Sequence, residues 1–178
     1  MLTEPAFFSG SLDDLRRVRA AVPTPLLEKD FVVTEYQILE AAATGADAVL
    51  LIVAALDEAS VGRLLSVARG YGLAALVEVH DREELTRAVE AGADVIGVNS
   101  RNLKTLDVSL SVLDELGPMI PAGVVAVAES GLKTSADLIR LRQVRYNAFL
   151  MGERFVIEPD PGAALGRIRD EVERPWSA

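Results

Sequence analysis

The sequence predicts an α/β fold in which short parallel strands alternate with helices. Apolar runs begin about every 20 to 29 residues, which is the spacing of repeated βα units. Most runs are continuously apolar rather than alternating, as expected for strands covered on both faces. Half of the 178 residues are hydrophobic but only 5% are aromatic. The core is therefore expected to be aliphatic.

The expected strands cover residues 26–33, 48–55, 74–80, 95–100, 124–130 and 148–152. Ahead of them, Leu2-Thr3-Glu4 reads as the end of one further strand. Helix starts between the strands are indicated by capping residues. These are Ser11, Asp57, Asp81 followed by Glu84, Ser109, and Thr134 or Ser135. A last helix is expected over 159–172, followed by a polar tail over about 173–178.

A short internal repeat supports this division. Thr44-Gly45-Ala46-Asp47 and Ala91-Gly92-Ala93-Asp94 each precede a strand, and Arg145-Tyr146-Asn147 is a degenerate third copy. In each complete copy the glycine can end a helix in the left-handed conformation. No low-complexity linker interrupts the chain, so residues 1–178 are expected to form a single domain.

Repeated βα units allow either a barrel or an open doubly wound sheet. The open dinucleotide-binding sheet needs a glycine-rich first turn, and the sequence has none. Nearly every expected strand instead has a polar residue or glycine at its carboxyl end, and in a barrel those ends converge on one mouth. With six strands and one stub, the prediction is an incomplete (β/α)8 TIM barrel.

Composition excludes several classes of site and partner. The sequence has no cysteine and one histidine, His80, which argues against a disulfide, a zinc site or a Ser-His-Asp triad. A net charge of -9 argues against nucleic-acid binding. No apolar run is long enough to span a membrane and no signal peptide is visible, so a cytoplasmic protein without membrane contact is expected.

Two strand ends carry candidate acid–base groups. Lys29 could act as an electrophile or general acid towards a carbonyl, or it could be a surface lysine paired with Asp30 or Glu28. Glu78 lies in an apolar strand, where burial favours general acid–base chemistry, although a structural ion pair is the alternative. His80 reads equally as a capping, surface or catalytic residue, and no role is assigned to it.

Later strand ends carry candidate substrate contacts. Asn99 could orient a substrate group or form a turn, and Arg101 could contact an anion or make a surface ion pair. Glu129-Ser130-Gly131 and Met151-Gly152-Glu153 end the last two strands, where barrels often hold phosphate. Each tripeptide alone also fits an ordinary tight turn.

Taken in order, these segments resemble the indole-3-glycerol phosphate synthase family over nearly the whole chain. The matching segments are Leu2-Thr3-Glu4, Leu27-x-Lys29-Asp30-Phe31, Leu50-Leu51-Ile52-Val53-Ala54, Leu76-Val77-Glu78-Val79-His80, Gly97-Val98-Asn99-Ser100-Arg101-Asn102-Leu103, Ala128-Glu129-Ser130-Gly131 and Ala148-Phe149-Leu150-x-Gly152-Glu153. The family closes an indole ring on 1-(2-carboxyphenylamino)-1-deoxyribulose 5-phosphate and releases CO2 and water.

The resemblance implies a role for each candidate residue. Lys29 matches the general acid, Glu78 the acid–base carboxylate of the later dehydration, and Asn99 a residue that orients the reacting substrate. Arg101, Glu129 and Ser130 match further substrate contacts. The phosphate site falls on Ser130, Gly131, Gly152 and Glu153, and the anthranilate ring packs against Phe8, Phe31 and Leu103. The resemblance implies neither a metal nor an organic cofactor.

The family's first strand carries a Glu-x-Lys pair that these 178 residues do not contain, and Glu153-Arg154-Phe155-Val156 departs from the family's usual run after Gly152. Three hypotheses therefore stand: a synthase-like enzyme, a catalytically impaired barrel fragment that binds phosphate or serves as an assembly partner, and another phosphate-barrel enzyme. Exposed sheet edges would favour a dimer or a complementing N-terminal segment.

Overall fold

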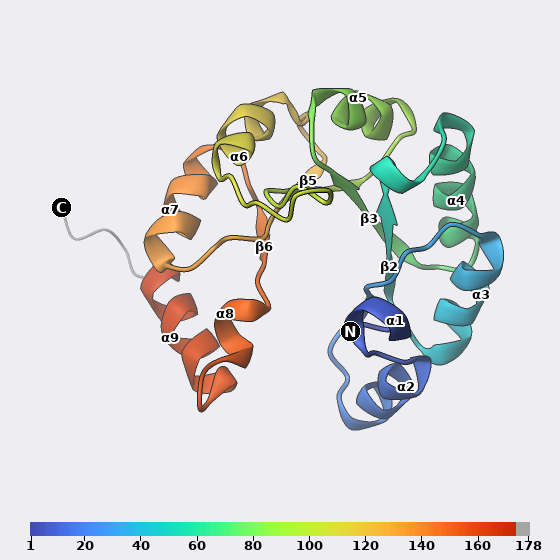
Figure 1. The fold of residues 1–178 in the computed structure, drawn as a ribbon, viewed down its shortest axis with the longest axis horizontal. Coiled ribbons are helices and arrows are strands. Elements are labelled where there is room, and N and C mark those ends of the chain that lie inside the picture. Colours follow the sequence, from blue (N-terminus) through green and yellow to red (C-terminus); the bar gives the residue numbers. More distant parts are fainter. Residues whose placement is uncertain (174–178) are drawn as a thin grey trace. The chain divides into compact units, whose positions relative to one another are not determined.

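The structure, a computed structural model, describes residues 1–173. The chain clusters into two compact units, one spanning Met1–Ile96 and the other beginning at Gly97. Each unit combines parallel strands with helices (Figure 1). The expectation of a single domain stays a prediction. The polar tail expected over about 173–178 lies, beyond Glu173, outside the described residues.

Three parallel strands form the sheet of the first unit. They are β1 (Leu27–Glu28), β2 (Ala48–Ile52) and β3 (Ala74–Val79), with β2 pairing to both of the others. Leu2 forms a parallel bridge to Lys29, and the Thr3 N–H donates to the Lys29 carbonyl over 3.3 Å. The N-terminal residues therefore occupy the position of a further strand beside β1, as predicted.

Three of the five helices of the first unit begin at capping residues that the sequence indicates, whereas the caps of the other two, Glu4 and Thr34, were not predicted. The five helices are α1 (Pro5–Phe8), α2 (Leu12–Ala21), α3 (Glu35–Thr44), α4 (Glu58–Gly70) and α5 (Arg82–Glu90). Ser11, Asp57 and Asp81 accept from the backbone three residues on, and so cap α2, α4 and α5. Helices α3 and α4 pack against β2, and α4 and α5 against β3, which buries the aliphatic strands (Figure 1).

Strand β4 (Val95–Asn99) begins in the first unit and ends in the second. The second unit continues with β5 (Val125–Glu129) and β6 (Ala148–Leu150), which pair in parallel. Its helices are α6 (Ser111–Leu116), α7 (Ser135–Gln143), α8 (Glu153–Val156) and α9 (Pro161–Glu173). Helix α9 packs against both α7 and α8 (Figure 1). Two 3₁₀ turns, η1 (Val53–Ala55) and η2 (Gly117–Met119), complete the elements of the two units.

The first predicted strand, 26–33, is much shorter than expected. Strand β1 has two residues, because the backbone beyond Lys29 is bonded by side chains instead of a neighbouring strand. The Phe31 N–H donates to the Asp30 carboxylate over 2.7 Å, and Gln37 accepts from the N–H of Val33 and donates to the Phe31 carbonyl. Similarly, the strand expected over 48–55 ends at Ile52, where η1 begins.

The prediction that Ser109 caps a helix is wrong. Helix α6 starts at Ser111 after Leu110, without a side-chain cap. The Ser109 N–H instead donates to the Ser100 carbonyl over 2.9 Å, which holds Ser109 in the preceding loop. Of the alternatives Thr134 and Ser135, Thr134 is the cap and forms a reciprocal capping box with Asp137.

The repeat has the backbone conformation expected of it. Gly45 and Gly92 are left-handed, with φ of 91° and 76°, at the ends of α3 and α5. In the degenerate copy Arg145 takes this conformation, with φ of 81°, although it carries a side chain. Within residues 1–173, none of the helices has the length and apolar character needed to cross a membrane.

Candidate functional site

Lys29 and Glu78 meet in the first unit. The ammonium Nζ of Lys29 lies 3.2 Å from Oε2 of Glu78, and the side chain of Glu78 is 2% exposed. Lys29 follows β1 and Glu78 lies on β3, so the two come from strands separated by β2. The neighbouring Asp30 accepts from the Thr3 hydroxyl over 2.8 Å and from the Phe31 N–H over 2.7 Å.

This pair suits proton transfer to and from a bound molecule. An ammonium that is partly exposed can present a proton to a carbonyl oxygen, and an adjacent carboxylate can take up or return protons. The carboxylate is costly to bury alone, and its contact with Lys29 offsets part of that cost. Both readings of Glu78, an acid–base group and a member of an ion pair, are therefore satisfied by the same geometry.

His80 is the neighbour that sequence reasoning left without a role. Its Nε2 lies 3.3 Å from Oε1 of Glu78, and its Nδ1 lies 3.0 Å from Oε2 of Glu84. Burial opposes a charge on the ring, but the interactions with Glu78 and then with Glu84 outweigh burial and raise the pKa of His80 to about 9. His80 is neither a cap nor a surface residue.

Three phenylalanines form an apolar surface in the same unit. The rings of Phe8 and Phe31 stack with centroids 5.6 Å apart, and Phe7 meets Phe31 edge-on at 5.8 Å. Phe7 and Phe8 are exposed on α1. This cluster brings together the two predicted ring contacts, Phe8 and Phe31, and adds Phe7, which the sequence did not single out. Leu103, the third predicted ring contact, is an exposed residue of the second unit.

A cavity of about 690 Å³ in the second unit brings together the residues predicted to hold phosphate. Four of its lining residues are Ser130, Gly131, Gly152 and Glu153, and Arg101 also lines it. Ser130 and Gly131 are both left-handed, with φ of 65° and 69°, so the chain turns sharply directly after β5. Their polar backbone and the nearby cations suit an anion.

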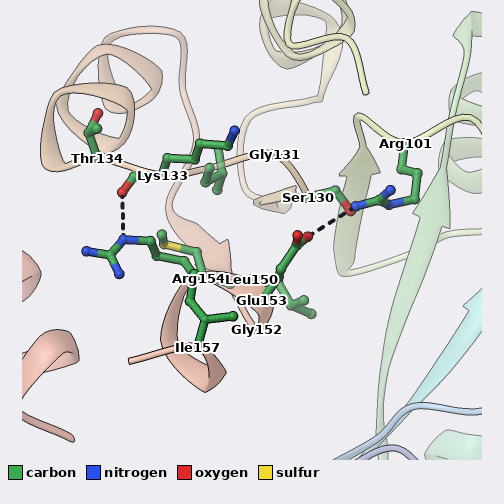
Figure 2. Close-up of a pocket in the computed structure, with 12 residues that line it drawn as sticks. Arg101, Ser130, Gly131, Lys133, Thr134, Leu150, Gly152, Glu153, Arg154 and Ile157 are labelled. Atoms are coloured by element: carbon green, nitrogen blue, oxygen red, sulfur yellow. Dashed lines mark hydrogen bonds and ion pairs between the residues drawn. The ribbon is translucent and has the colours of Figure 1, made fainter. Parts of the chain in front are cut away.

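Two cations of this cavity, Arg101 and Arg154, already have partners. Arg101 lies 3.5 Å from the Glu153 carboxylate, and the Nε of Arg154 donates to the Lys133 carbonyl over 3.3 Å (Figure 2). Arg154 also pairs with Glu158. Lys133, Thr134 and Arg154 were not predicted as site residues, and only their place after a strand-end glycine could have indicated them.

Asn99 and Glu129 occupy the ends of β4 and β5 in the second unit. Oδ1 of Asn99 accepts from the Arg101 N–H over 2.9 Å, and the Asn99 side chain thereby shapes the turn after β4. Glu129 is buried. The Ser100 N–H donates to the Glu129 carbonyl over 3.0 Å, which ties the two strand ends together. Across residues 1–173, no group of three or more His, Cys, Asp or Glu side chains is arranged to hold a metal ion.

Comparison with solved structures identifies the fold. The chain matches 3-hexulose-6-phosphate synthase from Salmonella typhimurium with a TM-score of 0.81 over 96% of this chain and 84% of that one. The sequences are only 14% identical, so the likeness is one of fold alone. It confirms the predicted class, an α/β fold with the parallel strands of an incomplete (β/α)8 barrel.

Comparison with known sequences identifies the family. The family model described as indole-3-glycerol phosphate synthase matches residues 1–168. The chain is 48% identical over 169 residues to indole-3-glycerol phosphate synthase from Sulfurimonas denitrificans, covering 95% of this chain and 64% of that protein. It is 50% identical over 175 residues to indole-3-glycerol phosphate synthase 1 from Streptomyces coelicolor, covering 98% and 65%. The chain therefore spans slightly less than two thirds of these relatives' length, and it belongs to the indole-3-glycerol phosphate synthase family.

Proposed function

We propose that the chain carries the ring-closing chemistry of its family. The substrate would be 1-(2-carboxyphenylamino)-1-deoxyribulose 5-phosphate, which is converted to an indole with loss of CO2 and water. The observation that carries this proposal is the contact of 3.2 Å between Lys29 and the buried carboxylate of Glu78. An acid and a base in contact with each other are what a reaction with successive proton transfers requires.

Lys29 would act first. Its ammonium donates a proton or a hydrogen bond to the sugar carbonyl oxygen, which makes the carbonyl carbon electrophilic. The ring carbon that bears the carboxylate attacks, a carbon–carbon bond forms, and CO2 departs with restoration of the aromatic ring. Glu78 would then serve the dehydration, in which a hydroxyl leaves as water and a proton is removed. The Phe8–Phe31 stack supplies a flat apolar surface for the aromatic ring.

The substrate's phosphate would occupy the cavity of the second unit. The backbone around Ser130, Gly131, Gly152 and Glu153 lines that cavity, and Arg101 adds a positive charge. We further assign Asn99 and Glu129 to substrate orientation and Leu103 to packing against the anthranilate ring, as the family resemblance implies. A protein with this substrate and no nucleic-acid or membrane partner would act in the cytoplasm.

Replacement of Lys29 tests the proposal. Lys29→Ala should lower indole formation roughly hundredfold or more, because it removes the proposed acid that polarises the carbonyl. Product fluorescence from the synthetic substrate measures this, with the chain alone and with the N-terminal third of the Streptomyces coelicolor relative added. Lys104→Ala, which removes an exposed lysine, is the matched control and should leave the rate unchanged. Equal activity of Lys29→Ala and the parent chain would remove the proposed role.

The second candidate function is binding without turnover. The 178 residues cover 64% to 65% of the two relatives, and they contain no first-strand Glu-x-Lys pair that could take part in turnover. A chain of this kind would bind a phosphate ester and would release no indole under any condition. Binding of the substrate without turnover, with and without the added N-terminal segment, would favour this candidate.

A further inference from the structure

The imidazole of His80 is held between two carboxylates. Nδ1 makes a hydrogen bond of 3.0 Å with Glu84, whereas Nε2 lies 3.3 Å from Glu78 in an ion-pair contact without a hydrogen bond. The ring is 13% exposed. Beyond Glu78 lies Lys29, at 3.2 Å from the other carboxylate oxygen. Glu84, His80, Glu78 and Lys29 thus form a row in which acidic and basic groups alternate.

Glu84 fixes the position of the ring. Its Oε2 accepts from the backbone N–H of His80 over 2.7 Å as well as facing Nδ1, which holds residue and side chain together. Glu84 is itself placed by the start of α5, where its N–H donates to the Asp81 side chain over 2.9 Å. The ring orientation is therefore set by an ordinary helix-capping arrangement, and Nε2 is left directed at Glu78.

His80 in turn restricts Glu78. One carboxylate oxygen, Oε1, lies 3.3 Å from Nε2 of the ring, and the other, Oε2, lies 3.2 Å from Nζ of Lys29. The charged ring favours this orientation of a carboxylate, whose terminal torsion is otherwise broadly distributed. The groups that face the ring within the first unit are Glu78 on β3 and Glu84 on α5, with Lys29 behind Glu78.

We propose that His80 is a positioning residue, which is fixed by Glu84 and holds the Glu78 carboxylate in the orientation that faces Lys29. This inference rests on the proposed function and names a residue to which the family resemblance assigned no role. The raised pKa of His80, about 9, agrees with a ring that stays protonated between two acidic side chains at neutral pH.

The contacts can be tested without any enzymatic activity. His80 is the sole histidine, so its imidazole signals need no assignment in a titration by nuclear magnetic resonance. The parent chain should titrate near pH 9. Glu78→Gln and Glu84→Gln should each lower that midpoint by about one pH unit or more. Glu83→Gln, which removes an exposed charge from the same turn of α5, is the control and should leave it nearly unchanged.

The positioning role is then tested on indole formation, again with the N-terminal segment added. His80→Ala should lower kcat about tenfold or more with little change in KM, because the substrate contacts remain while the carboxylate loses the charged ring beside Oε1. His80→Gln, which retains an N–H donor, should recover part of kcat. In the parent protein kcat should decline as the pH rises through the His80 midpoint, because the ring then loses its charge. Both variants lack the imidazole and should not show this decline.

Two results would overturn the inference. One is a His80 midpoint that Glu78→Gln does not move, because the contact would then be absent. The other is a kcat–pH profile of His80→Ala that coincides with that of an active parent protein. If no form of the protein makes indole, the proposed function fails, and the titration alone still decides whether His80 holds Glu78.

Discussion

Glu28 is a buried carboxylate of the first unit, and one of its oxygens lacks a hydrogen-bond partner. The residue is 3% exposed, and the oxygen without a partner is Oε2. Burial, together with repulsion from Asp30, raises the pKa of Glu28 to about 7, against the opposing effect of the Thr3 hydroxyl. An acid whose pKa is raised on folding is more easily protonated in the folded chain than in the unfolded one. Ionised Glu28 therefore destabilises the fold.

Glu28→Gln should stabilise the chain in alkaline solution. The penalty is absent below the unfolded pKa of about 4.5, grows as the pH rises, and is complete above about 7. The variant should thus gain roughly 2 kcal/mol of unfolding free energy at pH 8 and almost nothing at pH 4. Urea denaturation of variant and parent at both pH values measures this difference.

Variant and parent are compared at the same pH, because His80 also makes the free energy of unfolding depend on pH. The pKa of His80 is raised on folding, so its stabilising effect is complete below about 6.5 and is lost as the pH rises through about 9. That change is common to both proteins and cancels. Glu90→Gln removes an exposed carboxylate and should change stability by less than about 0.5 kcal/mol at either pH. A gain for Glu28→Gln that is equal at pH 4 and pH 8 would contradict the prediction.

Single residues were predictable where position alone implied chemistry. Lys29 and Glu78 follow apolar strands, and strand ends share one edge of a parallel sheet, so their meeting could be expected. His80 could not be read in the same way, because its neighbours Asp81 and Glu84 also form a helix start. The burial of Glu28 could not be predicted for a different reason. The alternation of side chains in a strand does not reveal which face lacks a partner for a carboxylate.

At the scale of elements, all six expected strands are present but some are shorter than predicted, and capping signals located four of the helix starts, while no start was predicted for α1, α3 or α8. A capping side chain and the helix it caps are a few residues apart, so Ser11, Asp57, Asp81 and Thr134 could be identified from sequence. Strand ends depend on which backbone groups a distant neighbour can reach. The segment after Lys29 is apolar enough for a strand, yet Asp30 and Gln37 take its backbone bonds.

The glycines in the turns after β5 and β6 differ in whether a side chain could replace their hydrogen. A side chain at Gly131 would lie 2.5 Å from Val108, and its φ of 69° disfavours any residue with a side chain. Gly152 has φ of -121° and open space where a side chain would lie. Only Gly152 can therefore be enlarged without disturbing the fold, which makes it the cleaner probe of the cavity.

Gly152→Val should weaken phosphate binding and leave stability almost unchanged. The added side chain would occupy the cavity beside Ser130 and Glu153, where a phosphate needs close approach to the backbone. We expect the dissociation constant for inorganic phosphate to rise about tenfold, equivalent to about 1.4 kcal/mol. Calorimetric titration measures binding, and thermal unfolding measures stability. Gly166→Ala, in α9 with nothing within 4 Å of the added methyl, should leave binding unchanged and raise stability by about 0.5–1 kcal/mol, because alanine favours a helix over glycine. Unchanged binding by Gly152→Val would place the anion elsewhere.

At the scale of the whole molecule, the 178 residues contain most of the family's functional residues but not all of them. The segments that carry Lys29, Glu78, Asn99, Ser130 and Gly152 are all present with family spacing, and the family model matches residues 1–168. The first-strand Glu-x-Lys pair is not among the 178 residues. In the family its lysine contacts the substrate carboxylate and takes part in acid–base chemistry, so its contribution would have to come from another polypeptide segment.

We therefore expect activity to depend on an added N-terminal segment. The chain alone should form indole slowly, and the N-terminal third of the Streptomyces coelicolor relative, supplied as a separate polypeptide, should raise the rate about tenfold or more. Pairing along an open strand edge would bring the segment to the site, since such an edge presents unpaired backbone groups.

Two controls separate catalysis from simple stabilisation: the segment with its first-strand lysine replaced by alanine, and the Lys29→Ala chain with the intact segment. Both should bind but give no gain in rate. If the chain alone already reaches the full rate, the first-strand pair is dispensable, and Lys29 with Glu78 suffices for the reaction.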